Sequence, residues 1–138
     1  MSIGEVYDIL LEPRRLEYRI RRRTMERDEL EMGLLPGAIR YDKDPVQTSP
    51  EDRLPEVVGK IADLDAVVKQ LRREKDMAVI KAADLIETLD SEVEKLVLTA
   101  YYIRRLPMTR IAGQVEYSVS HTYKIRREGI SHLARSQR

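Results

Sequence analysis

The chain contains no cysteine, no tryptophan and no phenylalanine, and only six of its 138 residues are glycine and six are proline. The absence of cysteine excludes a disulfide framework and any metal site built on thiolates, and it is compatible with a reducing compartment. All seven aromatic residues are tyrosine, while 36% of the residues are charged. This composition favours long helices that pack along narrow apolar seams over a thick globular core.

Long apolar runs are also missing from the sequence. No segment approaches the ~20 apolar residues that a membrane-spanning helix needs. Residues 1–4 do not form a basic stretch leading into an apolar one, so no secretion signal is predicted. We therefore expect a soluble, cytoplasmic protein that does not interact with a membrane.

Residue types that serve catalysis or metal binding are present but not grouped. The acidic residues of the segment 55–90 have no histidine partners at ligand spacing; they include Asp63, Asp65, Asp76, Asp84 and Glu87. Both histidines, His121 and His132, lie in the last third of the chain. No nucleophile arrangement and no glycine-rich phosphate loop is found. We expect no catalytic residues, no metal and no cofactor, and hence no enzyme.

The segment 55–90 carries the clearest periodicity of the chain. Its members alternate at spacings of four and three, and all but one are apolar: Val57, Ile61, Leu64, Val68, Leu71, Lys75, Ala78, Ala82, Leu85 and Leu89. This heptad pattern predicts a long helix whose seam is buried against another helix. Self-association of the long helix and an intramolecular hairpin would both bury this seam. The sequence leaves these two arrangements open.

Residues 3–34 also favour a helix, which can fold back along the heptad seam as an antiparallel hairpin. Its apolar stripe is sparse: Val6, Leu10, Leu16, Ile20 and Leu30. Pro13 is expected to kink this helix or to mark its true start. Gly33, Pro36 and Gly37 are expected to end it, and residues 38–50 then form an irregular connector because two prolines disfavour helix at the residues before them.

Residues 91–94 form the pattern of a capping box, with Ser91 at the N-cap and Glu94 at the third helical position. It predicts a fresh helix that runs through Arg105 and marks a domain boundary. The expected fold is all-α. A helical, coiled-coil hairpin spans residues 1–90, with its connector at about 35–54, and a small helix-turn-helix domain spans 91–138.

The last third of the chain has the pattern of a helix-turn-helix. Ile111, Ala112 and Val115 share one side of a first helix that Pro107 opens. Ser118 can start the second helix by accepting a hydrogen bond from a backbone N–H two or three residues later. The second helix has a matching stripe, made of Thr122, Ile125, Gly129 or Ile130, and Leu133.

A helix with this stripe buried turns a polar face outward, which a DNA major groove can accept. We predict that Ser120, His121 and Lys124 point toward the groove floor and read base edges. The predicted phosphate contacts are Arg110, Ser118, Tyr123, Arg126 and Arg127.

The spacing of these residues resembles a known family. The pattern consists of Arg110, Ile111, Ala112, Val115, Tyr117, Ser118, Thr122, Ile125, Ile130 and Leu133. It resembles the C-terminal promoter-binding domain of bacterial sigma factors and, more closely, small phage-encoded late-gene transcription activators. Upstream, Tyr41, Asp42 and residues 46–50, followed by a long charged helix and by Val97, Leu98 and Tyr102, are similar to phage and prophage proteins of Gram-positive bacteria.

This resemblance covers nearly the whole chain. It implies a transcription activator of phage or prophage genes that binds double-stranded DNA in the cytoplasm of a bacterial host; the sequence leaves open whether RNA polymerase is contacted. One residue departs from the pattern, because Glu116 stands where the turn usually has glycine. A glutamate with positive φ would be strained.

The charge distribution independently favours a nucleic-acid partner for the C-terminal segment. The chain has a net charge of only +1, but residues 101–138 hold eight Lys or Arg against two acids, which leaves the first hundred residues at −5. Residues 21–23 are three further arginines, but nearby acids favour an ion-paired, solvated face there.

Two functions of different class therefore stay open. The first is a sequence-specific DNA-binding transcription regulator. The second is a helical adaptor whose acidic stalk binds RNA polymerase or a packaging component, with only nonspecific DNA affinity. Homodimerisation is compatible with both.

Overall fold

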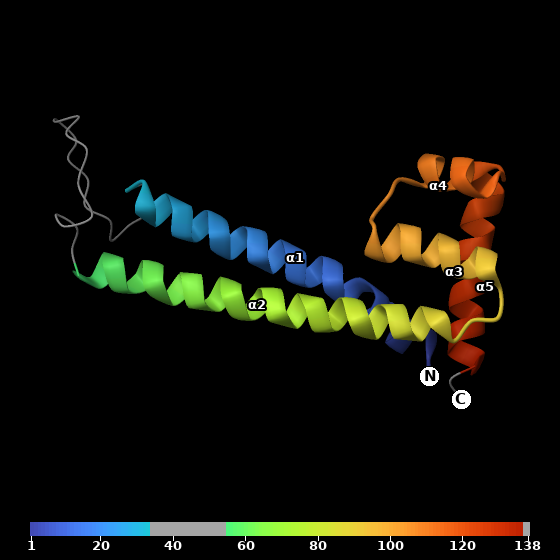
Figure 1. The fold of residues 1–138 in the computed structure, drawn as a ribbon, viewed down its shortest axis with the longest axis horizontal. Coiled ribbons are helices and arrows are strands. Elements are labelled where there is room, and N and C mark those ends of the chain that lie inside the picture. The colour runs from blue at the N-terminus through green and yellow to red at the C-terminus, as the bar shows by residue number, and fades with distance from the viewer. Residues whose placement is uncertain (34–54, 137–138) are drawn as a thin grey trace. The chain divides into compact units, whose positions relative to one another are not determined.

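The computed structural model describes residues 1–33 and 55–136, so the predicted connector lies outside the described residues. The elements follow the chain in this order: α1 (Ile3–Glu31), α2 (Pro55–Glu87), α3 (Glu92–Leu98), the π-helix η2 (Thr99–Ile103), α4 (Met108–Val115) and α5 (Val119–Ser136) (Figure 1). No strand occurs in the described part of the chain, and the all-α prediction is confirmed. None of the described helices combines the length and hydrophobicity of a membrane span.

The chain divides into two compact units. Unit 1 comprises Met1–Arg15 and Lys75–Arg138, and unit 2 comprises Leu16–Glu74. Helices α1 and α2 each contribute residues to both units. The predicted boundary between residues 90 and 91 falls after the end of α2, but it lies inside unit 1 because residues on both sides of it share one core.

Unit 2 is a pair of helix segments joined by one apolar seam. Leu30 of α1 packs with Val57, Ile61 and Leu64 of α2. The predicted seam positions Leu16, Ile20, Val68 and Leu71 are also buried. The seam is thus buried within the chain, as the hairpin prediction required.

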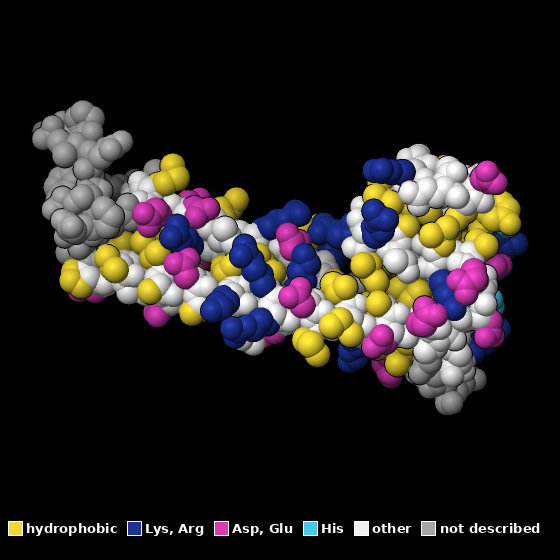
Figure 2. All heavy atoms as spheres, viewed as in Figure 1, with side chains coloured by type: hydrophobic (Ala, Val, Ile, Leu, Met, Phe, Trp, Pro, Cys, Tyr) yellow, Lys and Arg dark blue, Asp and Glu magenta, His cyan; other side chains and the backbone are white. Residues whose placement is uncertain are grey.

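Charged residues cover the outside of these helices, where both signs are interspersed (Figure 2). The Nε atom of Arg27 on α1 lies 2.9 Å from a carboxylate oxygen of Asp65 on α2. In the predicted ion-paired face, Arg21 contacts Glu17 at 3.3 Å and Arg23 contacts Glu26 at 2.9 Å. The latter two pairs lie within α1, and the solvated pair of Arg27 and Asp65 contributes little stability, so burial of the seam carries most of the association of α1 with α2 in this unit.

Unit 1 has two apolar clusters. The first joins α1, α2, α3, η2 and α5 and consists of Val6, Leu10, Ala82, Leu85, Ile86, Leu89, Leu98, Tyr102, Ile130, Leu133 and Ala134. The second lies under the helix-turn-helix and consists of Val97, Ala100, Met108, Ile111 and Ile125. Gly129 allows the close approach of α5 to α3, because a Cβ atom there would lie 3.2 Å from the Cδ1 atom of Leu98.

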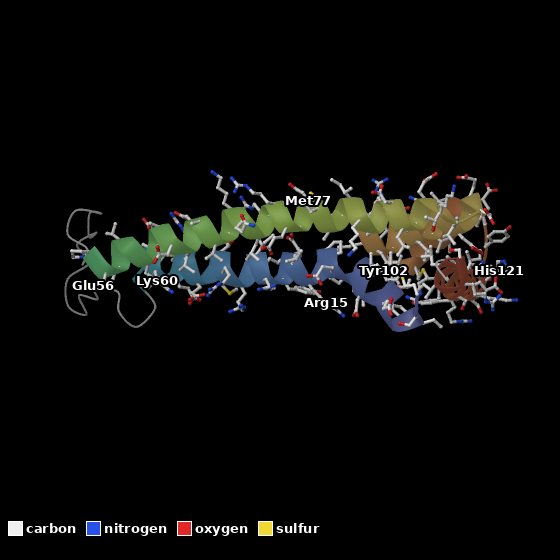
Figure 3. All side chains as sticks on the ribbon, turned by 90° about the horizontal axis from the view of Figure 1, so that it is seen from below. Arg15, Glu56, Lys60, Met77, Tyr102 and His121 are labelled. Carbon is white, nitrogen blue, oxygen red and sulfur yellow. The ribbon has the colours of Figure 1, made fainter. Side chains whose placement is uncertain are left out.

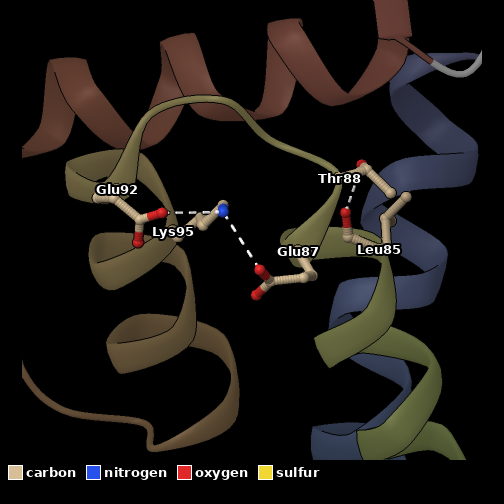
Figure 4. Close-up of polar contacts among 5 residues, drawn as sticks. All are labelled: Leu85, Glu87, Thr88, Glu92 and Lys95. Carbon is tan, nitrogen blue, oxygen red and sulfur yellow. Dashed lines mark hydrogen bonds and ion pairs between the residues drawn. The ribbon is translucent and has the colours of Figure 1, made fainter.

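The turn between α2 and α3 is held by polar contacts. Ser91 is the N-cap of α3 and accepts a hydrogen bond from the Glu94 N–H at 3.3 Å. The Lys95 ammonium lies between Glu92 and Glu87, at 3.1 and 3.2 Å (Figure 4). Hydrogen bonds to these two carboxylates raise the pKa of Lys95. The predicted start of a new helix at Ser91 is confirmed.

Of the two alternatives predicted for Pro13, a kink or the true start of the helix, the start is excluded because α1 begins at Ile3 and runs through Pro13. Two other local predictions need correction. The Glu94 carboxylate binds His132 on α5, with Nδ1–O distances of 2.8 and 2.9 Å, in place of the reciprocal bond of a capping box. The helix after Ser91 ends at Ile103 in a π-helical turn, since the Arg104 N–H donates to the carbonyl of Thr99. Arg105 then ends the helical path with a φ of 58°.

Candidate nucleic-acid interface

The first helix of the predicted helix-turn-helix is α4. Pro107 was predicted as the first helical residue but is the N-cap, so α4 begins one residue later, at Met108. The Pro107 carbonyl accepts the N–H groups of Arg110 and Ile111 at 3.0 and 3.1 Å. Ile111 and Ala112 are buried, and Val115 is partly buried against the same cluster. The predicted apolar side of α4 is confirmed.

The turn between the two helices depends on Glu116. This residue ends α4 in the left-handed region, with φ 61° and ψ 36°. Its N–H and that of Tyr117 both donate to the carbonyl of Ala112, which is the arrangement that glycine usually allows at a helix end. The expected positive φ at Glu116 is therefore present, and the residue carries a conformational cost.

Ser118 starts α5 as predicted. Its hydroxyl accepts a hydrogen bond from the His121 N–H at 3.1 Å. Its carbonyl accepts both the N–H and the hydroxyl of Thr122, at 2.9 and 2.8 Å, so the fully buried Thr122 has no unsatisfied hydroxyl. The predicted inner stripe is buried throughout: Thr122, Ile125, Gly129, Ile130 and Leu133.

The three predicted base-reading residues, Ser120, His121 and Lys124, are all exposed on α5. His121 lies at the surface, whereas Tyr102 lies among the packed helices (Figure 3). The Tyr117 ring meets the His121 imidazole edge to face, with ring centroids 4.6 Å apart. Lys124 is 60% exposed and lies 3.9 Å from Glu128, at the limit of an ion pair, so it is accessible to a ligand.

Four of the five predicted phosphate-contacting residues are exposed, namely Arg110, Ser118, Tyr123 and Arg127. Arg126 is half-buried instead. Its guanidinium carbon lies 4.6 Å from the centroid of the Tyr101 ring and 5.2 Å from that of Tyr123. Its Nε atom is buried and has no hydrogen-bond partner within the described residues.

Two features of this region were not predicted from the sequence. Tyr117 was recognised only as part of the family pattern, although its ring positions the imidazole of His121. The pair of Glu94 and His132 lines a pocket of about 410 Å³ between α3 and the end of α5. Glu94 and His132 are 38 residues apart in the sequence, so no local pattern indicates their contact.

No family model, no curated protein and no solved structure matches this chain. Within residues 1–33 and 55–136, no group of three or more His, Asp or Glu side chains is arranged to hold a metal ion.

Proposed function

We propose that the protein is a sequence-specific DNA-binding transcription regulator, an activator of phage or prophage genes, that places α5 in the major groove. The observation that carries this proposal is the division of α5 into two faces. Thr122 and Ile125 are buried, while Ser120, His121 and Lys124 are exposed on the first two turns. A recognition helix needs its base-reading side chains near its N-terminus in this way.

Electrostatics support the same partner. Residues 101–138 carry a net charge of +6 from eight cations and two acids, which attracts a polyanion. Arg110 and Arg127 are exposed and can contact phosphates on either side of the groove. Lys124 can donate to guanine O6 or N7, and Ser120 can donate to or accept from several bases. The proposed cytoplasmic location in a bacterial host comes from the resemblance to phage activators.

The first test is selection of DNA fragments by the purified protein from the host and phage genome. A sequence-specific regulator should enrich one motif and bind it at least ~10³-fold more tightly than random DNA. Retention of fragments without a common motif would contradict sequence-specific recognition and favour the adaptor function.

Two variants then separate base reading from phosphate binding. Lys124→Ala should cost about 1–3 kcal/mol on the preferred site and relax its base preference, whereas Arg127→Ala should weaken binding to all sequences alike. Lys69→Ala in unit 2 is the control for loss of one exposed positive charge. Equal losses on specific and random DNA for Lys124→Ala would remove Lys124 from the groove floor.

A further inference from the structure

The π-helix η2 presents two consecutive tyrosines to different surroundings. Tyr102 is only 3% exposed and belongs to the core, while Tyr101 is partly exposed. Their rings are perpendicular, with centroids 4.8 Å apart and an interplanar angle of 81°. Burial raises the pKa of Tyr102 to about 12, so this phenol is neutral at physiological pH and supplies no negative charge. π-Helical turns occur often at functional sites, which draws attention to the partly exposed Tyr101 ring.

Two arginines from distant parts of the sequence share the Tyr101 ring. The guanidinium carbon of Arg126 on α5 lies 4.6 Å from the ring centroid, and that of Arg14 on α1 lies 5.8 Å from it. Both distances are typical of cation–π contacts. The fold of unit 1 therefore gathers two positive charges around one aromatic ring.

Neither guanidinium is neutralised by a carboxylate of the described residues. Adjacent Arg15 provides the contrast, because it contacts Asp8 at 3.3 Å and Glu12 at 3.9 Å. Arg126 also has a buried Nε–H without an acceptor in that part of the chain. A buried donor without a partner is costly, and two like charges on one ring repel each other. An anion bound between the two guanidinium groups would offset their repulsion.

We infer that Arg14, Tyr101 and Arg126 form a binding site for a phosphate group of the DNA backbone. This inference deepens the proposed function and rests on it. Arginine guanidinium groups suit phosphate because their N–H groups match its oxygens in pairs. The site extends phosphate recognition from the helix-turn-helix to α1, the first helix of the chain.

The position of the site relative to the reading face supports this ligand. The ring centroid of Tyr123, a residue 38% exposed, also lies 5.2 Å from the Arg126 guanidinium carbon, and Tyr123 precedes the predicted base-reading residue Lys124. A chain of contacts thus leads from Tyr123, beside the base-reading residues, through Arg126 and Tyr101 to Arg14. A phosphate held here belongs to the strand that borders the groove.

The experiment compares two neighbouring arginines of α1. For DNA of the selected sequence, binding is measured from 0.1 to 1 M salt for the wild type, Arg14→Gln and Arg15→Gln. Loss of one phosphate contact should reduce the slope of log K against log salt by about 0.9, which corresponds to about eightfold weaker binding at 0.1 M relative to 1 M salt. Arg15→Gln removes the same charge and should leave the slope unchanged.

Arg126→Lys keeps the charge but loses the planar donor array, and it should reduce affinity on specific and random DNA alike. Circular dichroism melting verifies that each variant is folded. If Arg14→Gln and Arg15→Gln have equal slopes, the phosphate site is overturned while the helix-turn-helix proposal stands.

A second measurement covers the case in which the wild type binds no DNA. Melting temperatures are then compared in sodium phosphate and in sodium chloride of equal ionic strength and pH. A phosphate-specific increase in the wild type and in Arg15→Gln, but not in Arg14→Gln, would keep the oxyanion site and assign it to free phosphate. Equal shifts in all three proteins would overturn the site itself.

Discussion

Arginines have different neighbours in the two units of this protein. In unit 2, Arg21, Arg23 and Arg27 each contact a carboxylate, at 3.3, 2.9 and 2.9 Å. In unit 1, Arg14 and Arg126 face tyrosine rings. The contrast holds for particular arginines and not for whole units. Arg15 of unit 1 is paired with Asp8. Arg21 of unit 2 lies 5.8 Å from the Tyr18 ring in addition to its carboxylate. Arg14 and Arg126 differ because each contacts a ring without a carboxylate partner among the described residues, so they are available cations. Counting charges along the sequence does not reveal this difference, whereas the identity of the neighbours does.

The two units also differ in how their helices end. In unit 2, α1 is followed by Gly33 with a φ of 76°. In unit 1, α4 ends at Glu116 with a φ of 61°, and Arg105 after η2 has a φ of 58°. Glycine adopts this region without steric cost, but glutamate and arginine do not. Unit 1 thus contains local strain around the proposed DNA-binding helices that its packing has to offset.

The largest expected effect comes from charging one core position in each unit. Ile125→Asp should destabilise unit 1 by more than about 4 kcal/mol, because an unpaired carboxylate replaces a buried side chain. Leu64→Asp, at a residue 1% exposed, should do the same to unit 2. Hydrogen exchange measured by mass spectrometry reports the two units separately.

If the units are independently stable, Ile125→Asp should abolish amide protection in α4 and α5 and keep it in residues 16–31 and 57–74. Loss of protection throughout the chain would show that the two units unfold together. A variant that melts like the wild type and still binds DNA would place Ile125 on the surface and contradict the packing of α5.

The next largest expected effect is a loss of stability at alkaline pH that belongs to unit 1. The pKa of Tyr102 is raised to about 12 in the folded protein, from 10.0 in a free side chain, chiefly by burial. Between pH 10 and 12, the Tyr102 phenol keeps its proton in the folded state and loses it in the unfolded state. The contribution of Tyr102 to the free energy of unfolding is therefore complete below pH 10 and is lost as the pH rises toward 12. Unit 1 should lose about 2 kcal/mol over this range.

Tyr102→Phe should remove this loss, and unfolding by urea at pH 9 and pH 11.5 measures it. Tyr18, in the described part of unit 2, is 55% exposed, so its ring is not buried as the ring of Tyr102 is. An identical alkaline loss of stability in Tyr102→Phe and the wild type would assign the effect to another group.

The smallest effect concerns the strained turn. Glu116→Gly should stabilise unit 1 by up to about 1 kcal/mol, because glycine adopts φ 61° without strain but loses more backbone entropy on folding. Gly33→Ala in unit 2 is the opposite substitution and should destabilise by a similar amount. Urea midpoints for the two variants should therefore shift in opposite directions, and a lower midpoint for Glu116→Gly would mean that the glutamate side chain makes a compensating contact.

Periodicity predicted the parts of the fold that depend on local sequence. The heptad from Val57 to Leu89 gave the buried side of α2, and the stripe from Thr122 to Leu133 gave that of α5. Ser91 and Ser118 were recognised as N-caps because a hydroxyl at the start of a helix can accept a hydrogen bond from a backbone N–H of the first turn. These signals depend on residues within a turn or two of each other, so sequence alone contains them.

The remaining features depend on contacts between distant residues. The Glu94 carboxylate could accept a hydrogen bond from the backbone N–H of Ser91 or bind the imidazole of His132. The packing of α5 on α3 brings His132 near, and Glu94 binds it instead of the local N–H. The grouping of residues 1–15 with the C-terminal helices in one compact unit also depends on contacts between segments far apart in the sequence. For the candidate site, exposure of Ser120, His121 and Lys124 followed from the helical period, but the shared contact of Arg14 and Arg126 with Tyr101 has no local signature.

The π-helical turn at η2 can also be understood as one residue more than an α-helix would hold over the same rise. The bond from the Arg104 N–H to the Thr99 carbonyl spans five residues instead of four. Deletion of a single residue from Thr99–Ile103 would return this turn to α-helical geometry and leave the later residues near their present places. Tyr101 and Tyr102 could not both keep their places, so the deletion should disturb the two tyrosines while the helix-turn-helix that follows keeps its fold.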